Sequence, residues 1–237
     1  MNIKIRYKGT YLGLIWSALE PLFIFSLLYA VFTNIRVGRE ETFAIYLISG
    51  VILLHLFVRG SMSGLSSLRA NSGILTNMNI RKEFFPVVST GTVAIFMLVE
   101  VGVFLILIPF FGFPYNWTLI FLPVIMGLLL CLILGASYLL SIVSIYVKDA
   151  GLIWGVLSYS LIFISPVFWK LENAQGILLD FYKINPLGQL IEFNHLIVFG
   201  KIPTVNEWIY TSSIIFGILF FGYAIFQKFE KKVTEKI

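Results

Sequence analysis

The sequence predicts an all-α integral membrane protein with six transmembrane helices. Of its 237 residues, 59% are hydrophobic and only 12% are Asp, Glu, Lys or Arg, whereas soluble domains have about 45–50% apolar and about 25% charged residues. The apolar residues gather in long runs, and a bilayer core of about 30 Å needs about 20 helical residues for each crossing. Six crossings leave about 100 residues for connections. We therefore expect a single transmembrane domain over residues 1–237 and no large soluble domain.

The spans are expected on six apolar runs, in chain order Leu14–Ile35, Phe43–Met62, Pro86–Phe110, Leu119–Ile145, Gly151–Trp169 and Trp208–Phe226. The first run follows a short basic segment, as the apolar part of a signal peptide does. It contains Glu20 and Pro21, however, and no small-residue cleavage site ends it. We therefore expect an uncleaved first span.

Basic residues indicate the orientation of the spans. With both ends of the chain in the cytoplasm, the inner segments carry eleven Lys and Arg residues and the outer segments carry five. Cytoplasmic connections of membrane proteins are enriched in basic residues. This bias predicts both termini on the cytoplasmic side of the cell membrane, with residues 227–237 as a cytoplasmic tail.

Two connections are longer than a hairpin needs, and we expect function to reside in them. The inner connection covers residues 63–85. The outer connection covers residues 170–206 and contains two apolar pieces, Ile177–Tyr182 and Leu187–Phe199, on either side of Asn185-Pro186. Both pieces are too short to cross a bilayer. They either re-enter the membrane or lie at its surface.

Composition excludes several functions. Cys131 has no second cysteine to pair with, and His55 and His195 are too few for a four-ligand Cys/His metal site. The basic residues are scattered, which argues against a nucleic-acid partner. No P-loop, nucleophile elbow, HExxH helix or dinucleotide fingerprint occurs. We predict no catalytic residue, metal or cofactor on this chain, so any ATP is hydrolysed by another polypeptide.

Polar residues recur at helical spacing in three spans. Such a stripe either lines a substrate cavity or packs helix against helix through hydroxyl hydrogen bonds. Aromatic residues such as Tyr159 either stack on sugar rings or face lipid. Small residues in the second and fourth spans favour helix packing. The stripes are Ser26, Tyr29 and Thr33, then Ser137, Ser141 and Ser144, then Gly151, Trp154, Ser158 and Ser165, and the small residues are Gly60, Gly64, Gly127, Cys131 and Gly135.

Two ionisable residues lie inside neighbouring spans. His55 and Glu100 differ in depth by about 5–8 Å at a rise of about 1.5 Å per residue, so their side chains can meet. Ionisable groups within a membrane are functional candidates, and such a pair would serve a proton relay. A neutral Glu100 that is hydrogen-bonded to another helix is the simpler alternative. Arg59 lies nearer the inner surface, and we expect its side chain to extend toward that surface.

Short motifs follow one another along nearly the whole chain. The run Arg6–Trp16, RYKGTYLGLIW, is followed by Pro21. Further motifs come in the order Gly50, Asn71, Phe85-Pro86, Lys148-Asp149, Ser165-Pro166-Val167 and Asn185-Pro186-Leu187. With six spans and no ATPase motif, the chain resembles the permeases of type 2 ATP-binding-cassette exporters for O-antigen, capsule and teichoic acid. It departs from them in a shorter N-terminal interfacial segment, residues 1–13, and in lacking an Arg after Asn-Pro-Leu, where Asn194 and His195 lie nearby.

The resemblance implies a homodimer with a translocation pathway between the subunits. The pathway would be lined by the first and fifth spans, through Ser26, Tyr29, Thr33, Trp154, Ser158, Tyr159 and Ser165. Residues 170–206 would form re-entrant helices that close the exit, with Pro166, Trp169, Asn185 and Pro186 as the outer gate. The substrate would be a lipid-linked glycan that enters at the cytoplasmic leaflet.

The resemblance also implies two copies of a separate ATPase chain that binds ATP and Mg. The inner stretch Asn71–Glu83 would be the coupling helix, with Asn71, Ile74, Leu75, Met78, Arg81, Lys82 and Glu83 as its residues. Ile74, Leu75 and Met78 would form an apolar ridge, and Arg81 and Lys82 would add charge for a docking groove. A solvated cytoplasmic loop is the alternative for this stretch.

Other functions remain open on the sequence alone. A proton-coupled secondary transporter would use Glu100 and His55. An exporter of drugs or lipids would share the same permease plan. An intramembrane enzyme or assembly factor is a third class, for which the sequence offers no acid, base and nucleophile in one constellation.

Overall fold

The computed structural model describes residues 15–33, 42–78 and 80–233, and every regular element in these ranges is a helix. The predicted all-α class is confirmed for this part of the chain. The predicted interfacial segment, residues 1–13, lies outside the described residues. The α-helices are α2 Ile15–Thr33, α3 Phe43–Ser66, α4 Ser72–Asn77, α5 Phe84–Phe110, α6 Leu122–Tyr146, α7 Ala150–Ile164, α8 Ile177–Ile184, α9 Pro186–Val198 and α10 Val205–Val233, with short 3-10 turns at Arg69–Asn71, Trp117–Phe121 and Leu171–Asn173.

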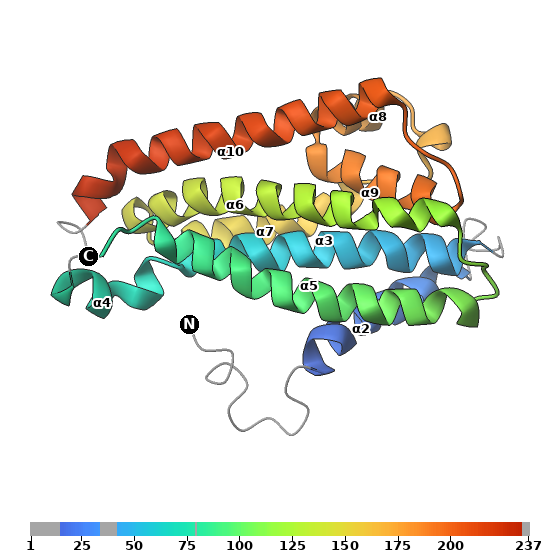
Figure 1. Ribbon diagram of the computed structural model, residues 1–237, viewed down its shortest axis with the longest axis horizontal. Helices are drawn as coiled ribbons and strands as arrows, with labels where there is room; N and C mark the ends of the chain where they lie inside the picture. The colour runs from blue at the N-terminus through green and yellow to red at the C-terminus, as the bar shows by residue number, and fades with distance from the viewer. Residues whose placement is uncertain (1–14, 34–41, 79, 234–237) are drawn as a thin grey trace.

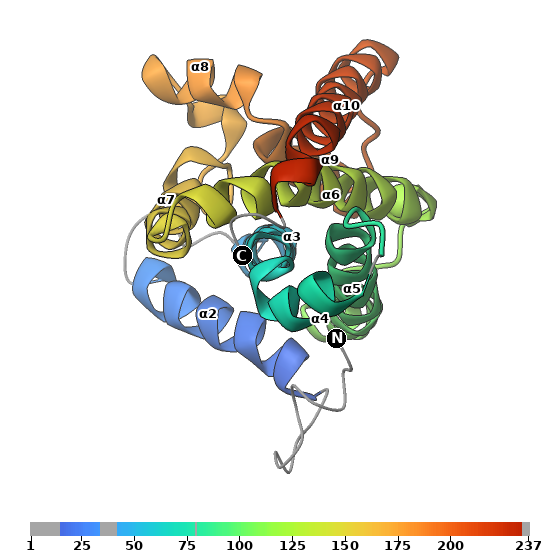
Figure 2. The ribbon, with the colours of Figure 1, turned by 90° about the vertical axis from the view of Figure 1, so that its left-hand side faces the viewer.

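Helix α3 is the centre of the bundle. From Phe43 to Phe57 it is apolar apart from Ser49 and His55, and all of these residues are buried, as expected for a helix without a continuous polar face. Seen end on, α2, α5, α6 and α7 surround it (Figure 2). Near its C-terminal end, Gly60 and Gly64 lie against α6, where an added Cβ would overlap Ile133 and Ser137. The predicted packing role of these two glycines is confirmed.

A second close contact joins α6 to α10. At Gly135 an added Cβ would lie 2.8 Å from the Cα of Leu219, and Gly222 lies against the Gly135 carbonyl. Gly127, which shares the predicted row of small residues, has nothing within 4 Å of an added Cβ. Only the Gly135 end of this row therefore packs against α10.

Four described helices are long and apolar enough to cross a membrane: α3, α5, α6 with the turn before it, and α10. The sequence predicted six spans, and the apolar helices Leu19–Thr33 and Ala150–Ile164 are shorter. Helix α7 ends at Ile164 and not at the predicted Trp169. Pro166 is the reason, because the residue before a proline avoids the helical conformation, and Ser165 has φ −95° and ψ 149°.

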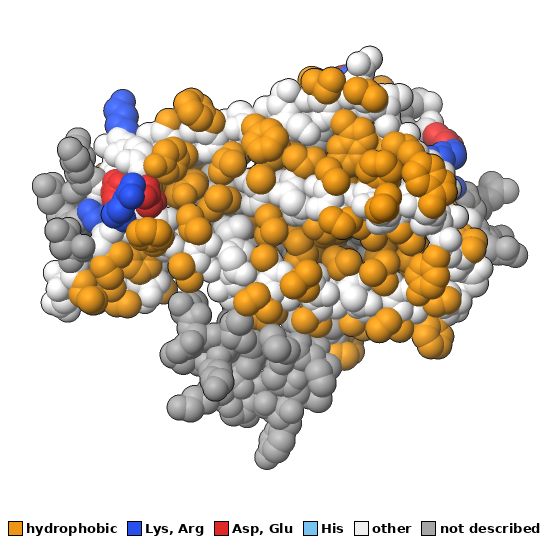
Figure 3. Space-filling model, viewed as in Figure 1, with side chains coloured by type: hydrophobic (Ala, Val, Ile, Leu, Met, Phe, Trp, Pro, Cys, Tyr) orange, Lys and Arg blue, Asp and Glu red, His pale blue; other side chains and the backbone are white. Residues whose placement is uncertain are grey.

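The two long connections lie at opposite ends of the bundle (Figure 1). Helix α4 and the last turns of α10 share one end, and α8 and α9 are at the other. Helix α10 continues to Val233, so the first part of the predicted tail, residues 227–237, is helical. The face drawn in Figure 3 is apolar between these ends, and its charged side chains gather near them. This distribution suits a protein that crosses a bilayer.

Helices α8 and α9 coincide with the two short apolar pieces predicted in the outer connection. Asn185 separates them, and its side-chain Oδ1 accepts a hydrogen bond from the backbone N–H of Leu187 at 3.1 Å. This is a normal N-cap, followed by Pro186 in the first turn. Most of α9 is buried against α3 and α6, whereas α8 has no buried residue. Helix α9 is therefore part of the bundle and does not rest on its surface.

Candidate functional site

Helices α2 and α7 flank α3 on one side of the bundle (Figure 2). Many of their apolar side chains are exposed. On α2, Leu27 is 69% exposed, and on α7, Tyr159 is 81% exposed. This α2–α7 face comprises Trp16, Phe23, Leu27, Tyr29 and Val31 with Leu152, Ile153, Val156, Leu157, Tyr159 and Phe163. It lies where the resemblance places a pathway between two subunits.

The predicted pathway residues of α2 lie on or beside this face. Ser26 and Tyr29 are exposed, and Thr33 is half-buried. The hydroxyls of Ser26 and Thr33 donate to carbonyls of their own helix, Leu22 O and Tyr29 O, each at 2.7 Å. Neither hydroxyl therefore holds a neighbouring helix in place.

Among the predicted pathway residues of the fifth span, Tyr159 is exposed, whereas Trp154, Ser158 and Ser165 turn toward the interior of the bundle. The indole N–H of Trp154 donates to Ser61 Oγ on α3 at 2.9 Å. Ser158 is buried, and Ser165 is fully buried. Ser158 donates to Trp154 O of its own helix at 2.6 Å, and Ser165 accepts a hydrogen bond from Asn185, so the packing interpretation fits these three side chains. The exposed side of α7 instead carries Ser160 beside Tyr159, and the predicted stripe did not include Ser160.

The fourth-span stripe is also a packing feature. Ser137, Ser141 and Ser144 are fully buried. Ser141 and Ser144 donate to carbonyls of α6 itself, Tyr138 O and Ser141 O. These serines leave room for close helix contact and do not line an open path.

The predicted outer-gate residues meet at one place, which we call the outer junction: Ser165, Pro166, Trp169, Asn185 and Pro186 with Tyr46. The Asn185 side-chain N–H donates to Ser165 Oγ at 3.0 Å. The hydroxyl of Tyr46, in the first turn of α3, lies 2.8 Å from Trp169 O and 3.3 Å from Pro166 O. Tyr46 thus ties the segment after α7 to the central helix.

Gly50 of α3 packs closely against the segment after α7 and against α9. An added Cβ there would lie 3.2 Å from both Val167 Cα and His195 Nε2. Asn194 and His195, which stand near the place of the missing Arg, bond back to α3. Asn194 donates to Ser49 O at 3.2 Å, and His195 Nε2 lies 3.1 Å from Tyr46 O. They hold α9 onto α3, which sequence reasoning had not foreseen.

The ionisable pair inside the bundle is part of a larger cluster. His55 Nδ1 lies 3.3 Å from Glu100 Oε2, as the matching depths predicted. Arg59 also lies 3.3 Å from Glu100, and its guanidinium stands 4.1 Å from the ring centre of Phe96. Glu20 of α2 lies 3.4 Å from His55 Nε2. A cavity of about 520 Å³ between α2, α3 and α7 opens onto Glu20, His55 and Arg59.

The prediction that Arg59 extends to the inner surface is wrong. Its side chain is only 8% exposed and turns inward to Glu100, which is buried. In the low-dielectric interior, the attraction between the Glu100 carboxylate and the Arg59 guanidinium keeps the guanidinium buried. The cluster therefore contains a fixed cation that the predicted pair lacked.

The predicted coupling segment, residues 71–83, contains one short helix, α4. Ile74 and Met78 are exposed, at 42% and 57%. Leu75 is 4% exposed and packs with Leu68 and Phe226, so its predicted place on the surface ridge is wrong. Because it follows Ile74 in the helix, it points about 100° away. The exposed apolar surface here is formed by Ile74, Met78, Ile80 and Phe84.

Helix α10 braces the end of the predicted coupling segment. Lys82 donates from its backbone N–H to Glu230 Oε1 at 3.2 Å and from Nζ to Glu230 O at 2.7 Å. Glu83 accepts from Gln227 at 2.7 Å and from Tyr223 at 3.2 Å. Arg81 pairs with Glu83 at 2.6 Å, and Asn71 donates to Ser67 O at 2.7 Å. Lys82 and Glu83 therefore make contacts within the protein. Sequence reasoning did not foresee these contacts, because the partners on α10 lie about 145 residues further along the chain.

Across residues 15–33, 42–78 and 80–233, no group of three His, Cys, Asp or Glu side chains could hold a metal ion. In the part of the chain that the structure describes, every regular element is a helix and four helices are long and apolar enough to cross a membrane. With charged side chains gathered near the ends of the bundle (Figure 3), these helices define a polytopic membrane protein. Residues 2–194 match the model of the ABC-2 type transporter family. The chain belongs to this family.

Curated relatives extend along nearly the full chain. The O-antigen export system permease protein RfbA of Myxococcus xanthus is 21% identical, with 100% of this chain and 92% of that protein covered. The capsule polysaccharide export inner-membrane protein CtrC of Neisseria meningitidis serogroup B is 24% identical, with 98% and 89% covered. The polysialic acid transport protein KpsM of Escherichia coli is 24% identical, with 97% and 91% covered.

Proposed function

We propose that this chain is the permease subunit of an ATP-driven exporter that moves a lipid-linked polysaccharide from the cytoplasmic side of the cell membrane outward. The observation that carries the proposal is the near-complete coverage by relatives that export O-antigen, capsule or polysialic acid. The proposed substrate class covers O-antigen, capsule and teichoic acid types. Both termini face the cytoplasm, and α2 and α7 complete six crossings.

The pathway in this proposal lies between two copies of the chain. The α2–α7 face supports it, because Leu27, Tyr159 and Phe163 are exposed and none of the described helices covers them. Aromatic rings offer stacking surfaces to the apolar faces of sugar rings. Ser26 and Ser160 are exposed on the same two helices as these side chains. A homodimer would enclose a corridor that holds a glycan without selecting one linkage.

The energy comes from two copies of a separate ATPase chain, which carry ATP and Mg. Helix α4 and the residues after it are the proposed docking site. Ile74, Met78, Ile80 and Phe84 present apolar surface there, and Arg81 is exposed beside them. Apolar anchors with a charged rim are typical of a protein interface. The bonds of Lys82 to Glu230 would transmit movement of this site to α10.

Co-purification tests this function. The tagged chain, extracted from its own cells in mild detergent, is expected to bring down a separate ATPase chain. Ile74→Asp should lose it and stop export, because a charge would enter an apolar contact. Ile202→Asp is the matched control, since Ile202 is also 42% exposed but lies in the outer connection. Equal ATPase recovery from both variants would disprove docking at α4.

A proton-coupled transporter is the second candidate, favoured by the 3.3 Å contact between His55 and Glu100. It predicts transport that survives removal of ATP and stops with a protonophore or with Glu100→Gln. The ATP-driven proposal predicts transport that stops when ATP is removed and survives a protonophore. An exporter of drugs or lipids on the same plan would be recognised by transport of such compounds in vesicles that fail to transport glycan.

A further inference from the structure

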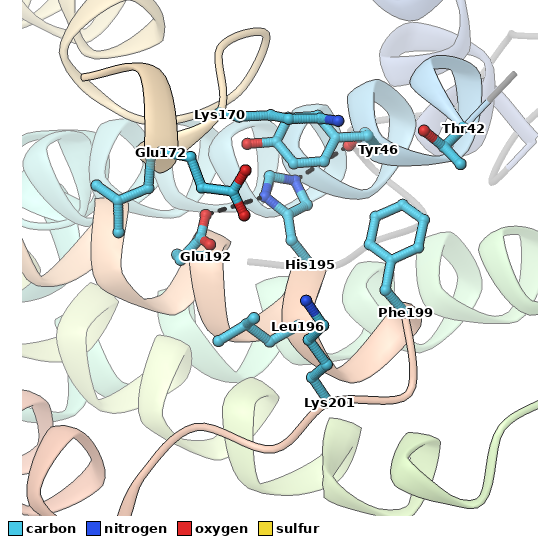
Figure 4. A pocket seen from close by; sticks show the side chains of 10 residues that line it. Thr42, Tyr46, Lys170, Glu172, Glu192, His195, Leu196, Phe199 and Lys201 are labelled. Atoms are coloured by element: carbon cyan, nitrogen blue, oxygen red, sulfur yellow. Dashed lines mark hydrogen bonds and ion pairs between the residues drawn. The ribbon is translucent and has the colours of Figure 1, made fainter. Parts of the chain in front are cut away.

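A small pocket lies at the outer end of the bundle, between the start of α3, the turn at 171–173 and α9 (Figure 4). Its volume is about 300 Å³, at the lower end of the roughly 300–1,000 Å³ range of small-molecule sites. This size suits one ring-sized group. Thr42, Tyr46, Lys170, Leu171, Glu172, Glu192, His195, Leu196, Phe199 and Lys201 line it.

Two buried acceptors face each other in this pocket. His195 is 2% exposed, and its Nε2 lies 3.1 Å from Tyr46 O. Because a carbonyl only accepts, Nε2 carries the proton and Nδ1 of the neutral ring is an acceptor. Burial lowers the pKa of His195, which favours this neutral form. Nδ1 stands 3.6 Å from Glu192 Oε2, and neither atom has a hydrogen-bond partner in the described protein.

Unpartnered buried acceptors are costly to a folded protein. A carboxylate oxygen and an imidazole nitrogen cannot bond to each other without a proton between them. Neither atom is exposed, so a ligand reaches them only once the Glu192 side chain, which is 15% exposed, turns aside. A ligand that carries two neighbouring donors then satisfies both atoms together. Adjacent hydroxyls of a sugar ring have that arrangement, since each can donate to one acceptor.

The rest of the lining suits a neutral, polar ring. Leu171, Leu196 and Phe199 supply an apolar wall. The charged residues of the lining are two lysines and two glutamates, so no net charge selects an ion. Hydroxyl groups both donate and accept hydrogen bonds, and lysine donors with glutamate acceptors match both roles.

The pocket is joined directly to the outer junction. The rings of Tyr46 and His195 stack with centres 3.6 Å apart, and the Tyr46 hydroxyl bonds the carbonyls of Pro166 and Trp169. A group that binds His195 would thus touch the residue that holds the segment after α7. In the proposed export function, this end of the bundle faces the outside.

We propose that this outer pocket binds a single neutral sugar unit of the emerging glycan through Glu192 Oε2 and His195 Nδ1. The proposal rests on the proposed export function. It makes the pocket a binding subsite beside the exit, where one residue of the polymer docks against α9 after crossing.

Glu192→Gln is the decisive variant. The amide keeps the shape of the side chain, and its N–H donates to His195 Nδ1, which supplies the missing donor from within the protein. Sugar binding should weaken at least fivefold, and the thermal midpoint of unfolding should rise. Asp180→Asn is the matched control, because Asp180 is an exposed carboxylate of α8 that contacts Lys183 and lies outside the pocket.

Saturation-transfer difference NMR on the chain in nanodiscs measures the binding. The probes are glucose, galactose, rhamnose and N-acetylglucosamine, with cyclohexanol as a ring that has one hydroxyl. Wild type and Asp180→Asn should give signals with at least one sugar and none with cyclohexanol, and Glu192→Gln should lose them. Absence of a sugar signal from wild type overturns the proposal. So does an unchanged signal with a lowered midpoint in Glu192→Gln, which would mean an internal ion pair.

The outcome can be separated from the export function itself. If wild type binds the ATPase chain and exports glycan but gives no sugar signal, the pocket assignment fails and the export proposal stands. If the ATPase chain does not bind and no glycan is exported, the export proposal fails whatever the pocket binds.

Discussion

Glu100 is 1% exposed and lies between a histidine and an arginine of α3. Taking its charge out of water is expensive, and the nearby guanidinium of Arg59 offsets much of that cost. Removal of one partner leaves the other charge buried and unpaired. Loss of either Glu100 or Arg59 should therefore weaken the contact between α3 and α5.

Glu100→Ala should destabilise the protein by about 3–5 kcal/mol, the usual effect of breaking a buried ion pair. The double variant Arg59→Met with Glu100→Leu should recover most of this loss, because it leaves no buried charge. Thermal unfolding in detergent measures both. Glu20→Ala is the control, since the Glu20 side chain is 60% exposed and its loss should matter less. A double variant as unstable as the single one would contradict the assignment.

Asn185→Ala should cost about 1–2 kcal/mol, because the residue caps α9 and also bonds Ser165. Chemical denaturation reports the change. The exposed Asn206 in the first turn of α10 is the control, and its replacement by alanine should have a much smaller effect. Equal effects at the two asparagines would argue against a junction at Asn185.

At the scale of helices, α3 and α6 approach closely because two glycines of α3 have no side chain. Cβ atoms at Gly60 and Gly64 would overlap α6, and small residues drive helix association in membranes through such close contact. Gly127 of α6 is also a glycine within a long apolar helix, but a Cβ added there would meet open space.

Gly64→Ala should therefore lower stability, and Gly127→Ala should raise it by about 0.5–1 kcal/mol, because alanine loses less backbone entropy in a helix than glycine does. Both variants add one methyl group, so each controls for the other. Unfolding midpoints in detergent decide the signs. The same sign at both positions would contradict the described packing of α3 on α6.

The contact between α10 and the predicted coupling segment also belongs to this scale. Glu230→Ala removes the acceptor of the Lys82 backbone N–H, so we expect ATP hydrolysis by the complex to continue while export falls several-fold. Lys228→Ala, an exposed residue of the same helix end, should leave the ratio of transport to hydrolysis unchanged. The two rates are measured together in proteoliposomes. An unchanged ratio in Glu230→Ala would show that α10 does not transmit the movement.

At the scale of the whole molecule, the α2–α7 face is the feature of the fold that bears most directly on the proposed function. Helix α3 is enclosed, α6 is covered by α10, and α2 and α7 lie at the edge of the bundle (Figure 2). Their outer sides carry exposed apolar side chains, as do the outer sides of α5 and α10. The proposed homodimer assigns the α2–α7 face to a second copy and to the substrate.

Cysteine cross-linking tests the homodimer. In a Cys131→Ser background, Tyr159→Cys should give a covalent dimer with a short thiol-reactive cross-linker in native membranes. Phe220→Cys on α10 should remain monomeric, although Phe220 is 75% exposed. A dimer through position 220 and not 159 would place the interface on the opposite helix.

Sequence periodicity predicted much of the fold because bilayer thickness and the loss of backbone hydrogen bonding in lipid permit only a few arrangements. The long helices, the two short helices around Asn185 and the depth match of His55 with Glu100 all follow from local spacing. The roles assigned to the coupling, pathway and gate residues remain predictions, although Ser165 and Asn185 do meet.

The sequence by itself determined the membrane class, the helical elements and the position of the two long connections, because these depend on hydrophobicity along the chain. Only the tertiary structure decided which face each residue presents. It buried Leu75, Ser158 and Ser165, turned Arg59 inward, and joined Lys82 to Glu230 and His195 to Tyr46. Such contacts join residues far apart in the chain, and their partners are set by how the helices rotate and pack, which no local pattern records.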